Sequence, residues 1–223
     1  MHDGTGMQDG GQENVADGIA AICALASAGQ ADAQLMLGQI LLDGTLLPRD
    51  ERAALGWFLA AARQGHAMGL NMVGRCCELG WGVAPAPADA LRWYRGAACA
   101  GLDWGMYNYA TGLTLGWDGA PDRVRALAWF RRAAAHGHCK SFNIIGGFYE
   151  DGWVVARDIG QARAWYVRAA EGGDFRGHFN LGRFLQAEGR HAQAQRHFDI
   201  ARRTGTPAFR AQMERFLAEH EVN

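Results

Sequence analysis

The chain has 223 residues, of which 49 % are hydrophobic, and this content supports a buried core and excludes disorder of the whole chain. The formal net charge of -1 argues against a nucleic-acid partner, because non-specific binding to nucleic acids depends on neutralising phosphates. No stretch reaches the ~18 consecutive apolar residues that a membrane-spanning helix needs, so we expect no membrane span.

The beginning of the chain lacks a basic segment followed by an apolar run, so it does not resemble a secretory signal. We expect residues 1–14 to form a loose tail. The five cysteines are an odd number at irregular spacings, unlike the even set of a secreted disulfide scaffold. These features favour free thiols and a cytoplasmic location.

A period of 36 residues runs through the rest of the chain. Trp57, Trp93, Trp129 and Trp165 are each 36 residues apart, and an aromatic residue follows each of them. Glycines recur with the same period in three series: Gly38, Gly74, Gly146 and Gly182, with Ala110 in the gap; Gly44, Gly80, Gly116 and Gly152; and Gly29, Gly65, Gly101, Gly137 and Gly173. A fixed period of this length indicates stacked structural repeats.

Each repeat is predicted to hold two helices, which we name helix A and helix B. In the first repeat, apolar residues at helical spacing around Leu37 end at Gly44, a position where a left-handed residue closes a helix. Asp50 then precedes the apolar stripe of helix B as an N-cap, and Asp122 and Asp158 repeat this cap.

The glycines inside helix A, such as Gly38, carry a cost of ~1 kcal/mol relative to alanine. A cost that recurs implies a structural reason, and we expect these glycines to provide the surface on which the tryptophan of helix B lies. The four tryptophans of the 36-residue series are therefore predicted to be buried between helices. On this prediction, Trp129→Ala costs about 3–5 kcal/mol as a large-to-small core change.

An unpaired helix over residues 15–30 is predicted before five repeats, and a last helix from Pro207 to about His220 after them. The fifth repeat has a loop four residues shorter than the others and carries His197 in place of the tryptophan. The predicted repeats cover residues 31–65, 66–101, 102–137, 138–173 and 174–205, and the predicted cap covers residues 206–223.

These motifs resemble the Sel-one-like repeat family, which is related to the tetratricopeptide repeats. The resemblance rests on segments such as Ala162-Arg-Ala-Trp-Tyr-Val-Arg-Ala-Ala-Glu-Gly-Gly in helix B and Phe179-Asn-Leu-Gly in helix A, and it covers residues 15–223. It implies an all-α fold, which we predict to be a right-handed α-solenoid of about five helix-turn-helix repeats with a C-terminal capping helix. It also implies a non-enzymatic scaffold or adaptor that binds another protein or a peptide.

By analogy with the tetratricopeptide repeats, helix A lines a concave groove. The predicted partner-binding residues at the groove positions of helix A are Asn71, Arg75, Trp104, Tyr107, Lys140, Asn143, Arg176, Phe179 and Arg183. Trp104 and Tyr107 are large anchors of the kind enriched in interface hot spots. Lys140, Arg176 and Arg183 predict a positive wall that suits an acidic segment or a free C-terminal end of the partner.

A second tryptophan series, Trp81, Trp117 and Trp153, follows the turn glycines at the same period. Two interpretations are open. The rings form a buried ladder that bridges neighbouring loops, or they form an exposed aromatic ridge that marks a partner surface.

His136, His138 and Cys139 raise an alternative function, a metal-dependent sensor or enzyme, because imidazole and thiolate are zinc ligands. The register favours a structural role, since His138 occupies an inter-repeat turn position equivalent to His66. No catalytic or cofactor-binding motif occurs in the sequence. We therefore expect no metal, no cofactor and no enzymatic activity.

Overall fold

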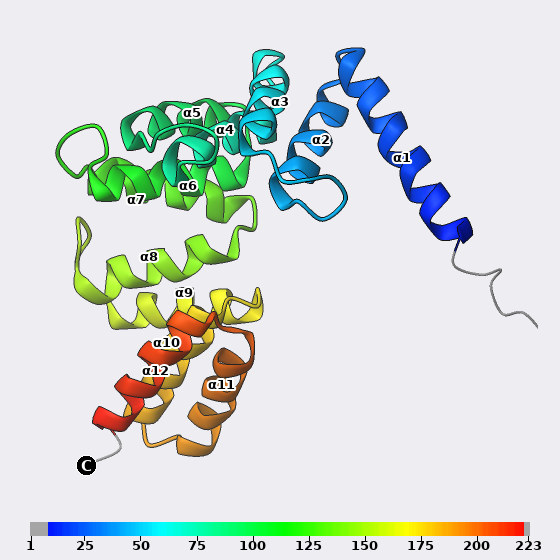
Figure 1. Cartoon of the computed structure of the whole chain (residues 1–223). Helices are drawn as coiled ribbons and strands as arrows, with labels where there is room; N and C mark the ends of the chain where they lie inside the picture. The colour runs from blue at the N-terminus through cyan, green and yellow to red at the C-terminus, as the bar shows by residue number, and fades with distance from the viewer. Residues whose placement is uncertain (1–8, 221–223) are drawn as a thin grey trace, which may run out of the picture. The chain divides into compact units, whose positions relative to one another are not determined.

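The computed structural model describes residues 9–220, and all regular structure within this range is α-helical (Figure 1). The helices are α1 (Asp9–Ser27), α2 (Ala31–Asp43), α3 (Glu51–Arg63), α4 (Ala67–Leu79), α5 (Pro87–Cys99), α6 (Asp103–Leu115), α7 (Arg123–Ala135), α8 (Cys139–Asp151), α9 (Ile159–Glu171), α10 (Phe175–Ala187), α11 (His191–Thr204) and α12 (Pro207–His220). They form two compact units. The first extends to Gly112 and includes Trp117–Gly119, and the second comprises Leu113–Gly116 and the chain from Ala120 onward.

Helices that follow one another in sequence pack against one another within each unit. In the first unit α3 contacts both α2 and α4, and α4 contacts α5. In the second unit the contacts run in the same way from α7 to α11. This stacking of helix pairs is the architecture of an α-solenoid, so the predicted all-α fold class is confirmed. The handedness and the number of repeats stay predictions.

The helix pairs coincide with the expected repeats. The pairs α2–α3 and α4–α5 fall within the predicted repeats 31–65 and 66–101, and the pairs α8–α9 and α10–α11 fall within 138–173 and 174–205. The two helices of the predicted repeat 102–137, α6 and α7, belong for the most part to different compact units.

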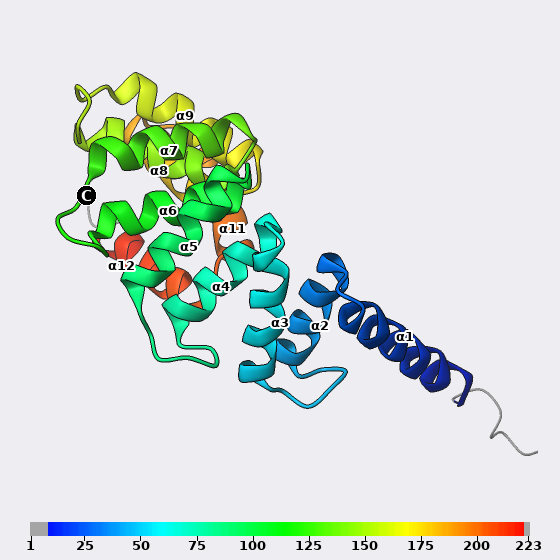
Figure 2. The same ribbon diagram turned by 90° about the horizontal axis from the view of Figure 1, so that it is seen from above.

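The first helix starts earlier than expected. Helix α1 begins at Asp9, whereas the sequence predicted a helix over 15–30 after a loose tail. Residues 1–8 of that predicted tail lie outside the described residues. Helix α1 lies beside α2, which in turn lies beside α3 (Figure 2). Near its C-terminal end, Ala26 packs with Ala33 and Leu37 of α2 in a small apolar cluster.

Helix α12 caps the last helix pair, as predicted from Pro207. In Figure 1 it lies in red alongside α10 and α11. Its apolar face buries Phe209, Met213 and Leu217 in one cluster with Leu185 of α10 and Phe198 of α11. The apolar side of the last pair is therefore covered by the chain itself.

The predicted helix ends are also confirmed. Asp50, Asp122 and Asp158 each accept a hydrogen bond at 2.9 Å from the backbone N–H three residues further on, which satisfies an unpaired donor of helix B. Gly44 and Gly80 close helix A with positive φ values of 70° and 80°, which a residue with a Cβ adopts only at a cost.

The prediction that the tryptophans of the 36-residue series are buried is wrong. All four are only partly buried. The aromatic residue that follows each of them is the core residue, and the relative exposures are 0 % for Phe58, 0 % for Tyr94, 1 % for Phe130, 2 % for Tyr166 and, in the fifth pair, 3 % for Phe198.

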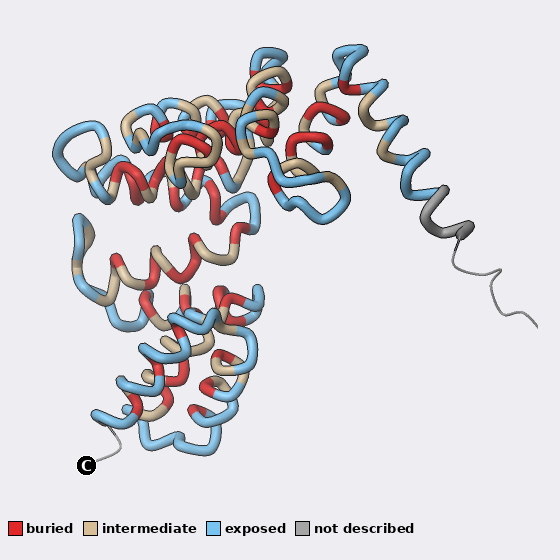
Figure 3. Tube along the Cα trace, viewed as in Figure 1, coloured by how far each residue is buried: buried red, intermediate tan, exposed pale blue. Residues whose placement is uncertain are grey.

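The helical period explains the difference. Successive residues of a helix point about 100° apart. Phe58 lies four residues after Ala54 and three before Ala61, both fully buried, so Phe58 points into the core and Trp57 lies at the rim of the apolar stripe. At the rim, arginine side chains cover two of the four indoles: the guanidinium carbon of Arg132 is 4.4 Å from the ring centre of Trp129, and that of Arg168 is 4.6 Å from that of Trp165. The same helical period is visible along α8, an A helix, where runs of buried residues (red) are separated by partly buried ones (tan) in Figure 3.

The glycines inside helix A are explained by the core aromatic and not by the tryptophan. A Cβ added to Gly38 would lie 2.6 Å from the ring of Phe58, closer than real Cβ contacts. The same holds for the other pairs of this kind, namely Gly74 with Tyr94, Gly146 with Tyr166 and Gly182 with Phe198. The ring of helix B thus lies directly on the backbone of helix A.

We predict opposite effects for two glycine-to-alanine substitutions in helices of the first unit. Gly38→Ala should lower the free energy of unfolding by about 1–3 kcal/mol, because its methyl group overlaps the Phe58 ring. Gly56→Ala in α3 meets nothing within 4 Å and should raise the same free energy by about 0.5–1 kcal/mol through helix propensity. Urea unfolding of both variants measures this. Stabilisation by both substitutions would contradict the ring-on-backbone contact.

Neighbouring aromatics of α7 provide a second test. Phe130→Ala should cost about 3–5 kcal/mol in unfolding free energy, because a fully buried ring leaves a cavity. Trp129→Ala should cost less than half as much, because part of the indole is already in contact with solvent. Urea unfolding decides between them, and a larger loss for Trp129→Ala would place the tryptophan in the core after all.

Candidate protein-binding face

Asparagine pairs join consecutive A helices within each unit. Asn108 of α6 donates its side-chain amide to Asn71 Oδ1 of α4 at 2.9 Å, and Asn180 of α10 donates to Asn143 Oδ1 of α8 at 2.8 Å. Asn71 and Asn143 were predicted to contact a partner, but they are only 3 % and 8 % exposed. Asn71 and Asn143 instead link neighbouring A helices through these side-chain hydrogen bonds. Asn108 was not among the predicted residues.

A tyrosine of helix B binds a glutamate near the end of helix A in two of the repeats. Tyr166 Oη donates to Glu150 Oε2 at 2.6 Å, and Tyr94 Oη donates to Glu78 Oε2 at 2.5 Å. Burial, the hydrogen bond and the carboxylate charge raise the pKa of both tyrosines, so both hydroxyls stay protonated and act as donors. These tyrosines are also the core rings, so the core fixes where each carboxylate points.

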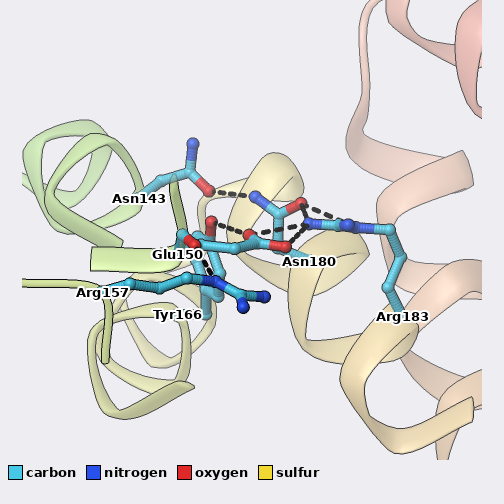
Figure 4. Close-up of polar contacts among 6 residues, drawn as sticks. All are labelled: Asn143, Glu150, Arg157, Tyr166, Asn180 and Arg183. Carbon is cyan, nitrogen blue, oxygen red and sulfur yellow. Dashed lines mark hydrogen bonds and ion pairs between the residues drawn. The ribbon is translucent and has the colours of Figure 1, made fainter. Parts of the chain in front are cut away.

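Arg183 of α10 completes the network in the second unit (Figure 4). Its Nη2 lies 3.1 Å from Glu150 Oε2 and 2.9 Å from Asn180 Oδ1, and its guanidinium lies 5.7 Å from the ring centre of Phe179. Arg157 Nε also donates to the backbone carbonyl of Glu150 at 2.9 Å. The predicted positive wall is therefore weaker than expected, because the charge of Arg183 is matched by Glu150.

The other predicted partner-binding residues of the second unit differ in their exposure and in their contacts. Arg176 is exposed and its guanidinium lies 4.5 Å from the ring of Phe175, while Lys140 is partly buried. Phe179 packs against the rings of Phe209 and Phe216 from the cap, at 5.7 and 5.3 Å between ring centres. At α10, the chain's own C-terminal helix therefore covers part of the predicted contact surface.

In the first unit the predicted aromatic anchors come together. Trp104 and Tyr107 of α6 meet edge to face, with ring centres 6.2 Å apart, and Trp104 is 39 % exposed. Arg75 of α4 is partly buried, and its guanidinium lies 4.8 Å from the ring centre of Trp81. Trp104 therefore presents part of its indole at the surface of an A helix.

The second tryptophan series is neither uniformly buried nor uniformly exposed. Trp81 and Trp117 are partly buried, and Trp117 lies 6.4 Å from Tyr94 between ring centres. Trp153 is 40 % exposed and is held between Phe148, at 5.7 Å, and the guanidinium of Arg123, at 4.4 Å. The three rings thus have separate environments, and only Trp153 reaches the exposure expected for a ridge.

The metal hypothesis gains no support within residues 9–220, where no three His, Cys, Asp or Glu side chains gather as ligands. His138 is buried, with its Nδ1 3.0 Å from Ser141 Oγ, and the Cys139 thiol contacts the carbonyl of Gly137 at 3.5 Å. His138 thus has the structural role that the register favours. In the same range, no helix combines the length and apolarity needed to cross a bilayer.

The 36-residue helix pairs and their ring-on-glycine contact define a helical-repeat protein of the α-solenoid class. A sequence model of the Sel1 repeat matches residues 31–66, 67–102, 104–138 and 145–174. The chain therefore belongs to the Sel1 repeat family, and the predicted resemblance is confirmed. The family model does not reach the fifth helix pair, which has the shortened loop and His197. Sel1 repeats generally serve as scaffolds for protein–protein interaction.

Several crystal structures share this fold. A Sel1 repeat protein from Oxalobacter formigenes is 27 % identical, with a TM-score of 0.73 over 79 % of this chain and 72 % of that one. The protective antigen c5321 of uropathogenic Escherichia coli is 24 % identical, with a TM-score of 0.73 over 90 % of this chain but 44 % of its own. The immunity protein Pa5087 of Pseudomonas aeruginosa is 19 % identical, with a TM-score of 0.57 over 77 % of this chain and 65 % of that one. No curated protein matches this chain in sequence.

We predict that Arg183 contributes to stability. Arg183→Leu should lower the free energy of unfolding by about 1–3 kcal/mol, because the largely buried Glu150 carboxylate loses its cation. Arg202→Leu is the matched control, since the Arg202–Glu214 pair also joins two helices but its side chains are 40 % and 50 % exposed. That loss should stay below about 1 kcal/mol. Equal losses in urea unfolding would show that the Glu150 network has no special weight.

Proposed function

We propose that this chain is a non-enzymatic scaffold that binds a partner protein or peptide through the A-helix face of its first unit. The observation that carries the proposal is the aromatic pair on α6, where Trp104 is 39 % exposed and Tyr107 supports it edge to face. Large aromatic side chains that are accessible and held in place are the residues that dominate binding energy at protein interfaces. The family's general role as an interaction scaffold supports the same assignment.

The difference between the two units supports the choice of the first. Two repeats, or 72 residues, separate Trp104 and Tyr107 from Arg176 and Phe179. At Phe179 the rings of the cap occupy the A-helix face, whereas the equivalent Tyr107 borders an exposed indole. Within the second unit, Lys140 and Arg176 remain proposed contacts for an acidic segment or C-terminal end of the partner.

We also propose that the scaffold acts in the cytoplasm. All five cysteines lie within the described residues and are free thiols, and Cys76 and Cys77 are buried within α4. Burial raises the pKa of both thiols, to about 12 for Cys76, so neither is an activated nucleophile at neutral pH. Five free thiols suit a reducing compartment.

Two exposed tryptophans allow a matched test of the binding face. Trp104 lies on the A-helix face of the first unit and Trp153 lies on the loop edge of the second, with exposures of 39 % and 40 %. Affinity capture from the source cell, followed by quantitative mass spectrometry, measures recovery of partners by each alanine variant. Trp104→Ala should reduce recovery of the specific partner about tenfold or more, the loss typical of a hot spot. Trp153→Ala should leave recovery unchanged.

The opposite result would move the binding surface to the loop edge around Trp153, Val124 and Val154, which are also exposed. Unchanged recovery with both variants would contradict an aromatic contact on either surface. Thermal unfolding of each variant separates a lost contact from a lost fold, because both side chains are on the surface and neither substitution should prevent folding.

A further inference from the structure

The Arg183 network of the second unit is a complete receptor for a guanidinium group. The Glu150 carboxylate accepts at 3.1 and 3.2 Å, Asn180 Oδ1 accepts at 2.9 and 3.2 Å, and the ring of Phe179 lies 5.7 Å from the guanidinium carbon. A charged acceptor, a neutral acceptor and an aromatic face are the groups that recognise arginine best. Tyr166 fixes the orientation of the Glu150 carboxylate by donating a hydrogen bond to its Oε2.

Three residues of this receptor have counterparts 72 residues earlier in the first unit. Glu78, Asn108 and Tyr107 stand at the positions equivalent to Glu150, Asn180 and Phe179. Tyr94 holds Glu78 as Tyr166 holds Glu150. Asn108 uses its amide group to bind Asn71, as Asn180 does with Asn143, so the amide oxygen of Asn108 is directed to the same side of the helix pair.

The arginine itself does not recur. The position equivalent to Arg183 is Thr111, whose hydroxyl donates to the backbone carbonyl of Tyr107 at 2.9 Å. Among the residues that the structure describes, no cation forms an ion pair with Glu78. The first unit therefore has residues equivalent to the acceptors of the site, and it has no arginine at the position equivalent to Arg183.

We propose that Glu78, Asn108 and Tyr107 form a recognition site for the side chain of an arginine that the bound partner supplies. The inference rests on the proposed scaffold function and names the chemistry of one contact within it. Trp104 lies one helical turn before Asn108, so an apolar residue beside that arginine would reach the exposed indole. The partner segment thus combines an arginine with a neighbouring apolar side chain.

Arg75 is the local alternative donor. It lies one turn before Glu78 on α4, and its equivalent in the second unit is Gly147. Its guanidinium lies over the ring of Trp81, at 4.8 Å from the ring centre, and not on the carboxylate. The charge of Arg75 partly offsets the rise in the pKa of Tyr94, the partner of Glu78, but its guanidinium makes a cation–π contact and forms no ion pair with the Glu78 carboxylate among the described residues. An external cation therefore competes with Arg75 for Glu78.

Arginine is favoured over lysine by the shape of the site. In the second unit Nη2 of Arg183 donates to both the Glu150 carboxylate and Asn180 Oδ1, and Nε of the same planar group also donates to Asn180 Oδ1. An ammonium group has no planar fork and makes weaker use of the ring face. The site should therefore discriminate between the two cations.

Titration of the full chain with arginine amide tests the site directly. The readout is the side-chain amide signal of Asn108 in nitrogen-15 NMR spectra, with citrulline amide as the neutral probe of equal shape and lysine amide as the second cation. We expect a saturable shift with arginine amide, a weaker response with lysine amide and none with citrulline amide. The signal of Asn180 should not move, because Arg183 already occupies the equivalent site.

Variants distinguish the site from general charge attraction. Glu78→Gln should weaken binding of arginine amide about tenfold or more, the factor for loss of a charge-assisted pair. Glu51→Gln, which removes a carboxylate paired with Arg49 in the same unit, should leave it unchanged. Thr111→Arg should fill the site from within, abolish binding and raise the midpoint of thermal unfolding.

Three outcomes would overturn the proposal. They are an equal shift in wild type and Glu78→Gln, an equal response to citrulline amide, and binding that appears only in Arg75→Ala, which would show that Arg75 fills the site.

Partner capture separates this inference from the scaffold function itself. If Trp104→Ala loses the partner while Glu78→Gln retains it, the scaffold function stands and the arginine contact fails. If arginine amide binds as expected and Trp104→Ala retains the partner, the proposed binding face fails and the local site stands.

Discussion

The contact between an aromatic ring of helix B and a glycine of helix A is the constraint on which four of the five repeats depend, and in the repeat 102–137 Ala110 stands at the glycine position. A ring can lie against a helix backbone only where no Cβ intervenes, and an added Cβ would approach the ring to 2.5 Å in the Gly182–Phe198 pair. This approach sets the spacing of the two helices. The cost of glycine in a helix, ~1 kcal/mol, is offset by burial of the ring, which contributes about 1.5–3 kcal/mol.

Much of the fold could be predicted because it depends on local sequence. The period, the aspartate caps and the glycine helix ends all follow from short-range preferences, and each was found where expected. The choice between Trp57 and Phe58 as the core residue was missed because two adjacent aromatics both fit the broad apolar stripe of a helix. The fully buried Ala54 and Ala61 lie on the same helix face as Phe58. The spacing of these alanines in the sequence would have identified Phe58 as the core residue.

The binding face was harder to predict because its contacts join different helices. Sequence position selected Trp104, which is 39 % exposed, as a partner contact, and it also selected Asn71, which is 3 % exposed and accepts a hydrogen bond from Asn108. Hydrogen bonds between side chains 37 or 16 residues apart depend on how the helices cross. One signal was nevertheless present, since the Tyr–Glu separation of 16 residues occurs at both Glu78 and Glu150.

The identity of the core ring has a consequence for how the repeats can be exchanged. The ring is a phenylalanine at positions 58, 130 and 198 and a tyrosine at 94 and 166, and only the tyrosines reach a glutamate at the end of helix A. The helix pair thus recurs in every repeat, whereas the tyrosine–glutamate hydrogen bond recurs in every second repeat. Removing 36 residues would keep every ring on a small residue but break the alternation of polar and apolar pairs. Removing 72 residues would preserve both, so the interchangeable module of this protein is a pair of repeats.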